Sequence, residues 1–335
     1  MKKYILVDAM NLLFRAKHST HRASDTWTKI GVCLHIMFSA VNKVVKKLDG
    51  DHIVFMLDGR SWRKDFYEPY KKNRKKLRDK LSAHEQEEEQ MFFEIFADFH
   101  KYLHERTNCT VLKNDNAEAD DLIARWIALH PMDEHVIVSS DSDFYQLITN
   151  HVVQYNGISD QLITLDGFFD NKDKLVIDKK TKEPKEPPNP KWLLFEKCIR
   201  GDTSDNIFSA FPGVRKKSTK NKIGLLEAFD DMDNKGYAWN NLMLQHWTDH
   251  NDIEHRVLDD YERNKQLIDL TQQPESIIHS VDETIKEATT SKNVNGVGIH
   301  FLKFCGKYEL TNISNYPDQY AKWLNKPYKG EISND

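Results

Sequence analysis

The sequence predicts an α/β fold with a mainly parallel sheet flanked by helices, and three short apolar runs carry this prediction. Each run is rich in β-branched residues and leads to an aspartate: Ile5–Val7 before Asp8, Ile53–Leu57 before Asp58, and Val136–Val138, followed by two serines, before Asp141. Continuous apolar runs of this length are typical of strands buried on both faces of a parallel sheet. Helical patterns lie between them, and such alternation is typical of α/β proteins.

The elements between these strands follow from the spacing of apolar residues. Apolar residues recur at helical intervals from Ile30 to Leu48, which predicts a helix before the second strand. The capping-box sequence Ser82-Ala83-His84-Glu85 predicts the start of another helix, whose apolar face continues to Leu103. A short strand from Cys109 to Leu112 and a helix that begins near Ala117 complete the alternation.

The composition changes around residues 170–191, where charged residues are joined by four prolines: Pro184, Pro187, Pro188 and Pro190. Such a stretch predicts a solvated loop or linker. We therefore expect an α/β core over residues 1–190 and a mainly helical C-terminal region over residues 191–335. No motif is found after about Leu270, so a peripheral helical role is expected there.

The bulk composition excludes several classes of protein. A net charge of -4 and a hydrophobic fraction of 39% over 335 residues are typical of a globular chain. The acidity does not exclude a nucleic-acid partner, because the two signs of charge are segregated along the chain. The four cysteines are widely spaced, which argues against a zinc site or a disulfide framework and indicates a reducing compartment. We expect a cytoplasmic monomer without a signal peptide or a membrane span of roughly 20 apolar residues.

Acidic side chains gather where the predicted strands end. Asp8, Asp58 and Asp141 each follow a strand, and ligands of open α/β sheets bind beyond the carboxyl ends of the strands. Further acids lie in the motifs Glu118-Ala119-Asp120-Asp121, Asp141-Ser142-Asp143 and Gly201-Asp202-Thr203-Ser204-Asp205-Asn206. Converging carboxylates raise one another's pKa unless a cation compensates their charge. Mg²⁺ or Mn²⁺ suits such oxygen ligands, and two of these ions can promote phosphodiester cleavage.

Each acid taken alone also has a structural explanation. An aspartate at a strand end is often a turn residue or a helix N-cap, and the Glu118 motif suits the start of a helix. Repetition of this placement at three strands is not typical of turn chemistry. The joint pattern therefore favours a functional cluster.

Basic residues concentrate directly after Asp58. From Arg60 to Lys80 there are ten lysines or arginines against three acids, and aromatic residues are interleaved among them. A charge run is usually a solvated helix face, but interleaved aromatics favour nucleic acid, because bases stack on them while phosphates pair with the cations. A second basic set follows Pro212-Gly213; it indicates a hairpin whose amides face a phosphate, although a surface turn explains it about as well.

Taken in order, these motifs resemble those of the flap endonuclease / 5′-3′ exonuclease family, closest to the bacteriophage 5′ nucleases. The motifs are Val7-Asp8-Ala9 with Asn11-Leu12-Leu13-Phe14-Arg15, Leu57-Asp58-Gly59, Tyr70-Lys71-Lys72-Asn73-Arg74, Glu118-Ala119-Asp120-Asp121, Ser140-Asp141-Ser142-Asp143 and Gly201-Asp202-Thr203-Ser204-Asp205-Asn206. The resemblance spans roughly residues 3–230 and implies a PIN-like fold with a helical arch at about 60–90 and a helix-hairpin DNA-binding element at about 201–230. The hairpin departs from the family pattern, because no second glycine follows Gly213 until Gly224.

The resemblance also implies roles for single residues. One metal site would use Asp8, Asp58, Glu118, Asp120 and Asp141, and a second, more open site would use Asp143, Asp202 and Asp205. Two Mg²⁺ ions would be the cofactors, with Mn²⁺ as an alternative. Lys71 and Arg74, at the base of the arch, would contact the scissile phosphate. The residues expected to contact nucleic acid are Arg15, Arg63, Lys64, Tyr70, Lys72, Gly213, Arg215, Lys216 and Lys217.

The leading hypothesis is a structure-specific 5′ nuclease, a 5′-3′ exonuclease or flap endonuclease that leaves a 5′-phosphate and a 3′-hydroxyl. Its expected partners are DNA with a 5′ flap or nick and RNA–DNA hybrids, with ribonuclease H-type removal of RNA primers in DNA replication. Family analogy adds a sliding clamp, a single-strand-binding protein and the host-cell cytoplasm of a phage.

Two alternatives stay open. A PIN-like ribonuclease acting on single-stranded RNA would share the strand-end aspartates, but such domains are usually shorter and lack the long basic segment. A non-catalytic junction-binding protein would keep the fold without the chemistry. An unused acid cluster would only repel DNA phosphates, which argues against this last alternative.

Overall fold

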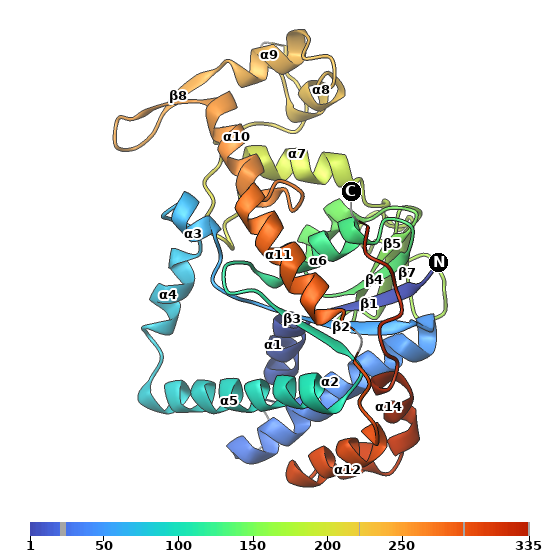
Figure 1. Ribbon diagram of the computed structural model, residues 1–335. Coiled ribbons are helices and arrows are strands. Elements are labelled where there is room, and N and C mark those ends of the chain that lie inside the picture. The colour runs from blue at the N-terminus through green and yellow to red at the C-terminus, as the bar shows by residue number, and fades with distance from the viewer. Residues whose placement is uncertain (21–24, 221, 291, 334–335) are drawn as a thin grey trace. The chain divides into compact units, whose positions relative to one another are not determined.

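The computed structural model describes residues 1–20, 25–220, 222–290 and 292–333 (Figure 1). The chain divides into two compact units. The first consists of Met1–Ser61, Leu81–Pro188 and Glu275–Asp335, and the second of Trp62–Lys80 and Asn189–Pro274. This division differs from the boundary expected at residue 190. The C-terminal segment returns to the α/β unit, and the basic segment after Asp58 belongs to the second unit.

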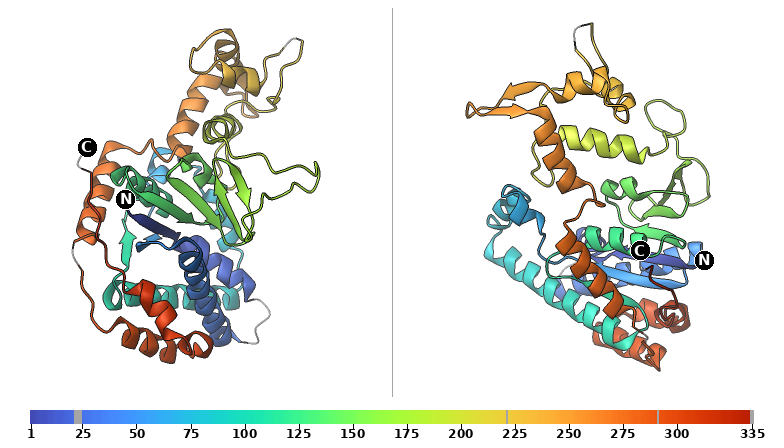
Figure 2. Two further views of the ribbon diagram at one scale, coloured as in Figure 1. Left: turned by 90° about the vertical axis from the view of Figure 1, so that its right-hand side faces the viewer. Right: turned by 45° about the horizontal axis from the view of Figure 1, so that its top comes forward.

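A seven-stranded sheet with the order β3-β2-β1-β4-β5-β6-β7 forms the centre of the first unit. The first five strands pair in parallel: β1 (Lys3–Asp8), β2 (His52–Leu57), β3 (Thr110–Lys113), β4 (Glu134–Val138) and β5 (Val152–Asn156). Two antiparallel strands, β6 (Gln161–Thr164) and β7 (Gly167–Phe169), extend one edge. The predicted mainly parallel sheet is confirmed, and the antiparallel edge is an addition to it (Figure 2).

Helices cover both faces of this sheet. One face packs against α1 (Ala9–Ser19), α2 (Thr26–Leu48), α5 (Ala83–Arg106) and the C-terminal helices α12 (Val297–Lys307), α13 (Thr311–Ser314) and α14 (Pro317–Leu324). The other face carries α6 (Ala119–Leu129), with α11 (Glu275–Ala288) beside it (Figure 1). Successive strand side chains point to opposite faces. Ile5 and Val7 therefore join the hydrophobic core on the α2 side, while Tyr4 meets Trp126 of α6 edge to face on the other side.

Helix α2 needs a separate remark, because by length and composition alone it could cross a membrane, which the sequence analysis did not expect. Half of its apolar window is buried inside the first unit. Ile30, Leu34, Phe38 and Val41 lie in the hydrophobic core there. The helix is therefore accounted for as a core helix, and its length and composition are weak evidence for a membrane span.

Helix starts follow the predicted capping chemistry. Ser82 and Glu85 form both bonds of a capping box at the start of α5. Glu118 and Asp121 form an equivalent reciprocal pair at the start of α6. Between β7 and α7 (Pro190–Arg200) neither a helix nor a strand forms, in a segment that is described throughout, as expected for the proline-rich stretch.

The second unit is mainly helical. It contains α3 (Arg63–Phe66), α4 (Lys72–Arg78), α7, α8 (Leu225–Asp230), α9 (Tyr237–Met243) and α10 (Val257–Ile268), together with a hairpin of β8 (His246–Thr248) and β9 (Glu254–Arg256). Its core gathers Phe195, Ile199, Leu225, Trp239 and Tyr261. Helices predominate in this unit, and the small β8–β9 hairpin was not expected from the sequence.

Candidate active site

The strand order β2-β1-β4 brings three predicted aspartates to one edge of the sheet in the first unit. Asp8 is the last residue of β1, Asp58 follows β2, and Asp141 follows β4 after two serines. Asp58 and Asp141 both act electrostatically on the carboxyl group of Asp8. The strand-end acids that the sequence analysis singled out therefore form one cluster.

Asp8 is the most buried member of this trio, with 7% of its surface exposed. Its carboxylate accepts hydrogen bonds from Asn11 N and from Ser139 Oγ, both at 3.0 Å. Burial raises the pKa of Asp8 to about 7 against the lowering effect of these bonds, and Asp58 and Asp141 raise it further. The site therefore favours an added proton or cation.

Asp58 and one further acid of the first unit, Glu118, lie where β2 and α6 meet. Asp58 accepts a hydrogen bond from Ala119 N at 2.8 Å, and Glu118 accepts one from Ser61 Oγ at 2.9 Å. Glu118 N in turn donates to Asp121 at 3.0 Å. Asp121 is fully buried in this cap, whereas Asp120 on the same turn is partly exposed. The structure therefore gives Asp121 a capping role.

A polar network that the sequence analysis missed orders the turn after β4. Ser139 Oγ accepts a hydrogen bond from Asp141 N at 3.1 Å while it donates to Asp8. Gln154, fully buried on β5, donates to the backbone oxygens of Ser139 and Asp141 at 2.9 and 2.7 Å. Asp141 then caps the following 3-10 turn by accepting from Asp143 N at 2.9 Å. The sequence signal for this network was a serine directly after one apolar strand and a glutamine within the next.

The donor chemistry of this cluster fits a hard divalent cation. Carboxylate oxygens are the ligands that Mg²⁺ and Mn²⁺ prefer, and a buried, raised-pKa aspartate gains most from a nearby cation. As they stand, no three acidic, histidine or cysteine side chains within the described residues converge closely enough to hold an ion. Their oxygens are turned instead toward backbone amides and hydroxyls. The ligand roles of Asp8, Asp58, Glu118, Asp120, Asp141 and Asp143 stay predictions.

The second unit holds its own charged cluster. Asp205 accepts a hydrogen bond from the Tyr70 hydroxyl at 3.1 Å and pairs with Lys71 at 3.6 Å and Arg74 at 2.6 Å. Asp202 pairs with Lys197 at 2.6 Å. Burial acts to raise the pKa of Asp202, but the bonds from Lys197 and Ser204 outweigh it and lower the pKa. The predicted phosphate-contacting cations and metal-binding carboxylates thus neutralise one another here.

Two residues that were predicted to contact nucleic acid, Arg63 and Tyr70, have their side chains buried in the second unit, and their contacts with nucleic acid stay predictions. Arg63 is 2% exposed, and its Nε donates to Leu267 O at the end of α10 at 2.7 Å. Tyr70 is 4% exposed, and its hydroxyl donates to Asp205. The mixture of basic and aromatic residues after Asp58 suggested a surface that binds nucleic acid. It did not reveal that this short segment also packs one of its faces into the core of the second unit. Lys64 and Lys72 remain exposed, with Lys72 paired to Glu68.

Arg15, predicted as a phosphate contact, is half-buried in the first unit. A β-carbon added at Gly157 would lie 2.1 Å from an Arg15 guanidinium nitrogen, so the two groups are closely packed. Burial lowers the pKa of Arg15, while Tyr155 and Asp160 act in the opposite direction. A structural role against the end of β5 accounts for these contacts, and the predicted phosphate contact is untested.

The turn between Gly213 and Gly224, part of the element expected to be a helix-hairpin, accounts for the absence of a second glycine directly after Gly213. Gly213 has a φ of 74°, a conformation that favours glycine, and Arg215, Lys216 and Lys217 are exposed beyond it. Gly224 lies at a close approach of two backbone segments, because a β-carbon there would lie 2.3 Å from the Lys217 carbonyl carbon. The Ser218 amide donates to Glu227 at 3.0 Å. Of the expected phosphate-facing amides, that of Ser218 is therefore already used within the hairpin.

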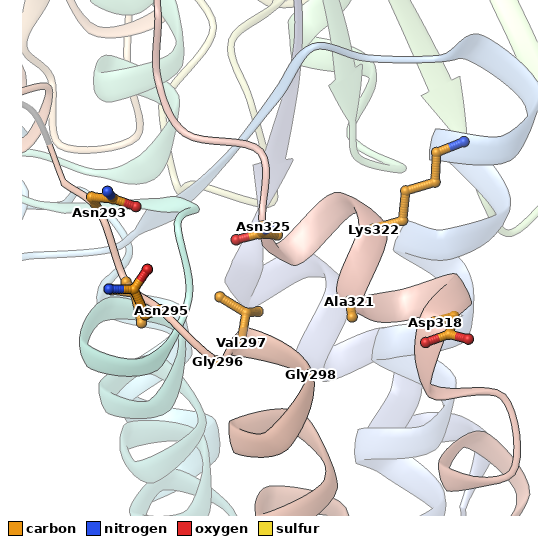
Figure 3. A pocket seen from close by; sticks show the side chains of 10 residues that line it. Asn293, Asn295, Gly296, Val297, Gly298, Asp318, Ala321, Lys322 and Asn325 are labelled. Atoms are coloured by element: carbon orange, nitrogen blue, oxygen red, sulfur yellow. The ribbon is translucent and has the colours of Figure 1, made fainter.

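A hollow of about 470 Å³ lies elsewhere in the first unit, at the start of α12 (Figure 3). It is lined by residues 293–298 and by Asp318, Ala321, Lys322 and Asn325. None of the strand-end aspartates lines it. This hollow is therefore separate from the acidic cluster.

Comparison with known proteins identifies related sequences. Residues 3–179 match the family model of the 5′-3′ exonuclease N-terminal resolvase-like domain. A 5′-3′ exonuclease of Mycoplasmopsis pulmonis is 24% identical over 240 residues, which cover 69% of this chain and 71% of that protein. A flap endonuclease Xni of Shewanella piezotolerans is 27% identical over 238 residues, which cover 70% of this chain and 80% of that protein.

Solved structures show the same fold. A bacteriophage T5 flap endonuclease crystallised with metal ions has a TM-score of 0.58 at 19% identity, covering 86% of this chain and 98% of that one. Its pseudo-enzyme–product complex with DNA and metal ions has a TM-score of 0.54 at 18% identity, covering 86% of this chain and 100% of that one. The predicted PIN-like α/β fold is confirmed by this likeness.

Proposed function

Because this chain belongs to the 5′-3′ exonuclease family, we propose that it is a divalent-metal-dependent 5′ nuclease that cuts DNA at 5′ flaps and nicks. The observation that carries the proposal is the cluster of Asp8, Asp58 and Asp141 at the carboxyl edge of the sheet. A buried carboxylate between two others is unfavourable unless a cation joins it. Related proteins described as exonucleases and flap endonucleases support the same activity.

Acidic residues are proposed to hold the metal ions needed for hydrolysis. Asp8, Asp58, Glu118, Asp120 and Asp141 are the ligands of one ion, and Asp143, Asp202 and Asp205 are assigned to a second. Bound Mg²⁺, or Mn²⁺ in its place, supplies an activated water and charge stabilisation for the leaving oxygen. The Ser139 hydroxyl and the Gln154 amide keep Asp8 and Asp141 in place within this set.

Cations of the second unit are proposed to act on the phosphate. Lys71 and Arg74 stabilise negative charge that develops on the scissile phosphate, as cations do in phosphoryl transfer. In the structure both are paired with Asp205, so they exchange this partner for the phosphate when substrate binds. Exposed Lys64, Lys72, Arg215, Lys216 and Lys217 supply weaker backbone contacts that position the nucleic acid.

The finer assignments follow the family and belong to the same proposal. The substrates include RNA–DNA hybrids, with ribonuclease H-type primer removal in DNA replication. Cleavage leaves a 5′-phosphate and a 3′-hydroxyl. The protein acts as a cytoplasmic monomer, in the host cell if it comes from a phage, with a sliding clamp and a single-strand-binding protein as further partners.

A flap-cleavage assay tests this proposal. Purified protein is incubated with a 5′-labelled flap duplex and with the matched single strand, each with Mg²⁺ or with chelator. The expected result is metal-dependent release of short products near the flap junction, with the single strand spared. Cleavage of single strands alone would instead support a PIN-like ribonuclease, and binding without cleavage would support a non-catalytic junction-binding protein.

One variant connects the activity to the acid cluster. Asp141→Asn removes one charge from an exposed side chain and keeps its size. We expect cleavage to be abolished while binding to the flap duplex is retained. Equal loss of cleavage and binding would count against the catalytic assignment of this aspartate.

A further inference from the structure

Two segments of the second unit, residues 69–74 and residues 202–206, are joined by reciprocal side-chain amides. Asn206 Nδ2 donates to Pro69 O at 2.7 Å. Asn73 Nδ2 donates to Thr203 O at 3.2 Å and to Ser204 O at 3.3 Å. We call these three bonds the asparagine clamp, in which each segment supplies one asparagine that binds the backbone of the other.

The clamp encloses a backbone bond and an unusual backbone conformation. Lys71 N donates to Asp205 O at 2.8 Å, between the two asparagines. Lys71 has a φ of 54° and Asn206 a φ of 58°. Asparagine adopts this left-handed conformation readily, but a long side chain such as lysine does so at a cost and needs surrounding contacts to hold it there. The clamp and the enclosed bond supply such contacts for Lys71.

The consequence of this geometry is the placement of charged groups. Lys71 Nζ lies 3.6 Å from Asp205 Oδ2, and Arg74 lies 2.6 Å from the other carboxylate oxygen. These residues come from two motifs that are far apart in the sequence. In each motif an asparagine next to the charged residues, Asn73 or Asn206, donates hydrogen bonds to the backbone of the other motif. The clamp thereby sets the distance between the two cations and the carboxylate.

We propose that Asn73 and Asn206 are positioning residues for phosphodiester cleavage, which fix Lys71 and Arg74 relative to Asp205 through the asparagine clamp. This inference rests on the proposed nuclease function. Neither asparagine is assigned a contact with the reacting atoms. Their loss lets the cations drift from the phosphate, and a misplacement of about 1 Å can cost roughly 100-fold in rate. Substrate binding is spared, because exposed lysines and arginines still contact the nucleic-acid backbone.

Four variants test the clamp in the full-length chain. Asn206→Gly removes the amide yet tolerates the positive φ, and Asn73→Ala removes the other amide. Asn73→Gln restores a carboxamide as the conservative variant. Asn240→Ala is the matched control, because Asn240 Nδ2 also donates to two backbone oxygens, those of Lys235 and Gly236, in the same unit.

The first readout separates rate from affinity. Single-turnover cleavage of a saturating flap duplex with Mg²⁺ is measured beside the dissociation constant in chelator. We expect Asn206→Gly and Asn73→Ala to lower the rate constant about 10- to 100-fold with the dissociation constant within about threefold. Asn73→Gln recovers most of the rate, and Asn240→Ala matches the unsubstituted chain. Equal rate losses in Asn240→Ala would overturn the proposal, because any lost surface amide would then have the same effect.

The second readout does not depend on activity. Backbone hydrogen exchange is followed in residues 70–74 and 203–206 of the metal-free protein. We expect either clamp variant to speed exchange in both segments, and Asn240→Ala to leave both unchanged. Unchanged exchange in the partner segment would overturn the clamp. If the unsubstituted protein cuts no flap, the proposed function fails, whereas exchange still decides whether the clamp holds the two segments.

Discussion

The acidic side chains of the two units differ in the groups that stabilise them: neutral hydrogen-bond donors in the first unit and lysine or arginine side chains in the second. Asp8 lies in a buried position where the Asn11 amide and the Ser139 hydroxyl donate to it, and burial raises its pKa to about 7. Asp205 and Asp202 are held by lysine and arginine side chains, with Arg74 and Lys197 each at 2.6 Å. The pKa of Asp202 is lowered, because its bonds from Lys197 and Ser204 outweigh its burial.

This difference indicates which cluster depends on an added cation. In the first unit a divalent ion relieves an unfavourable arrangement, so binding the ion and stabilising the fold are coupled. In the second unit a divalent ion must displace the lysine and arginine side chains that already pair with the carboxylates. We therefore expect the first cluster to bind the tighter ion.

The largest expected effect comes from removing the buried charge of the first cluster. Asp8→Asn should lower flap cleavage at least about 1,000-fold, because a metal ligand at the reacting centre is lost. The same variant should lose most of the rise in melting temperature that Mg²⁺ gives the unsubstituted protein. Asp166→Asn, in the exposed turn between β6 and β7, is the control and should change neither. A full Mg²⁺ response in Asp8→Asn would show that the ion binds elsewhere.

The pH dependence of stability is the next largest effect. Asp8 has a raised pKa in the folded state, about 7 against 3.8 for the free side chain, so the folded protein holds a proton that the unfolded chain releases. Its contribution is therefore most favourable below about pH 4 and is lost as the pH rises toward 7. We expect saturating Mg²⁺ to remove this decline, because the cation favours the ionised carboxylate.

Urea unfolding at pH 5 and pH 8, with chelator or Mg²⁺, measures this effect. The comparison is between the unsubstituted protein and Asp8→Asn, so that carboxylates titrating elsewhere cancel. The variant should lack the part of the decline that Mg²⁺ suppresses. The same decline in both proteins would exclude Asp8 as its source.

A smaller effect separates two neighbouring cations of the second unit. Arg63 is buried against the end of α10, so Arg63→Ala removes the donor to Leu267 O and should cost about 3 kcal/mol of unfolding free energy. Lys64 is exposed, and Lys64→Ala should change stability by less than about 0.5 kcal/mol.

DNA binding should distinguish the same two variants in the opposite sense. Lys64→Ala should lower the affinity for flap DNA and reduce the slope of log affinity against log salt by about one. Arg63→Ala, measured where it remains folded, should keep that slope. A reduced salt slope together with normal stability for Arg63→Ala would instead support the predicted phosphate contact of Arg63.

The sequence was sufficient for the central sheet and for the acids at its edge, because both depend on local patterns. An apolar run that ends in Asp8 or Asp58 predicts a strand and a carboxylate at its end without any knowledge of distant residues. Side-chain burial within the basic segment was not predictable, since it depends on α10, which lies far along the chain. Charge alone could not tell Arg63 from Lys64.

The unit boundaries were missed for the same physical reason. Residues 275–335 carry no motif, yet Phe301, Phe304 and Trp323 complete the core beneath the sheet, and that pairing is long-range. Ser139 and Gln154 show the limit within the site itself. Their roles depend on two neighbouring strands that bring a hydroxyl and an amide to Asp8 and Asp141.

The smallest expected effect compares a partly buried ion pair with an exposed one in the second unit. Lys197→Ala leaves Asp202, which is 8% exposed, without its cation, so we expect a loss of about 2 kcal/mol in the unfolding free energy. Lys72→Ala breaks an exposed pair with Glu68 and should cost less than about 0.5 kcal/mol.

Urea denaturation in chelator at low and high salt measures both losses. The loss in Lys72→Ala should vanish at high salt, while that in Lys197→Ala should persist, because salt screens exposed charges more than buried ones. Equal losses in the two variants would mean that Asp202 is solvated enough to need no internal cation. The contrast between the two units would then rest on Asp205 alone, whose carboxylate keeps both Lys71 and Arg74.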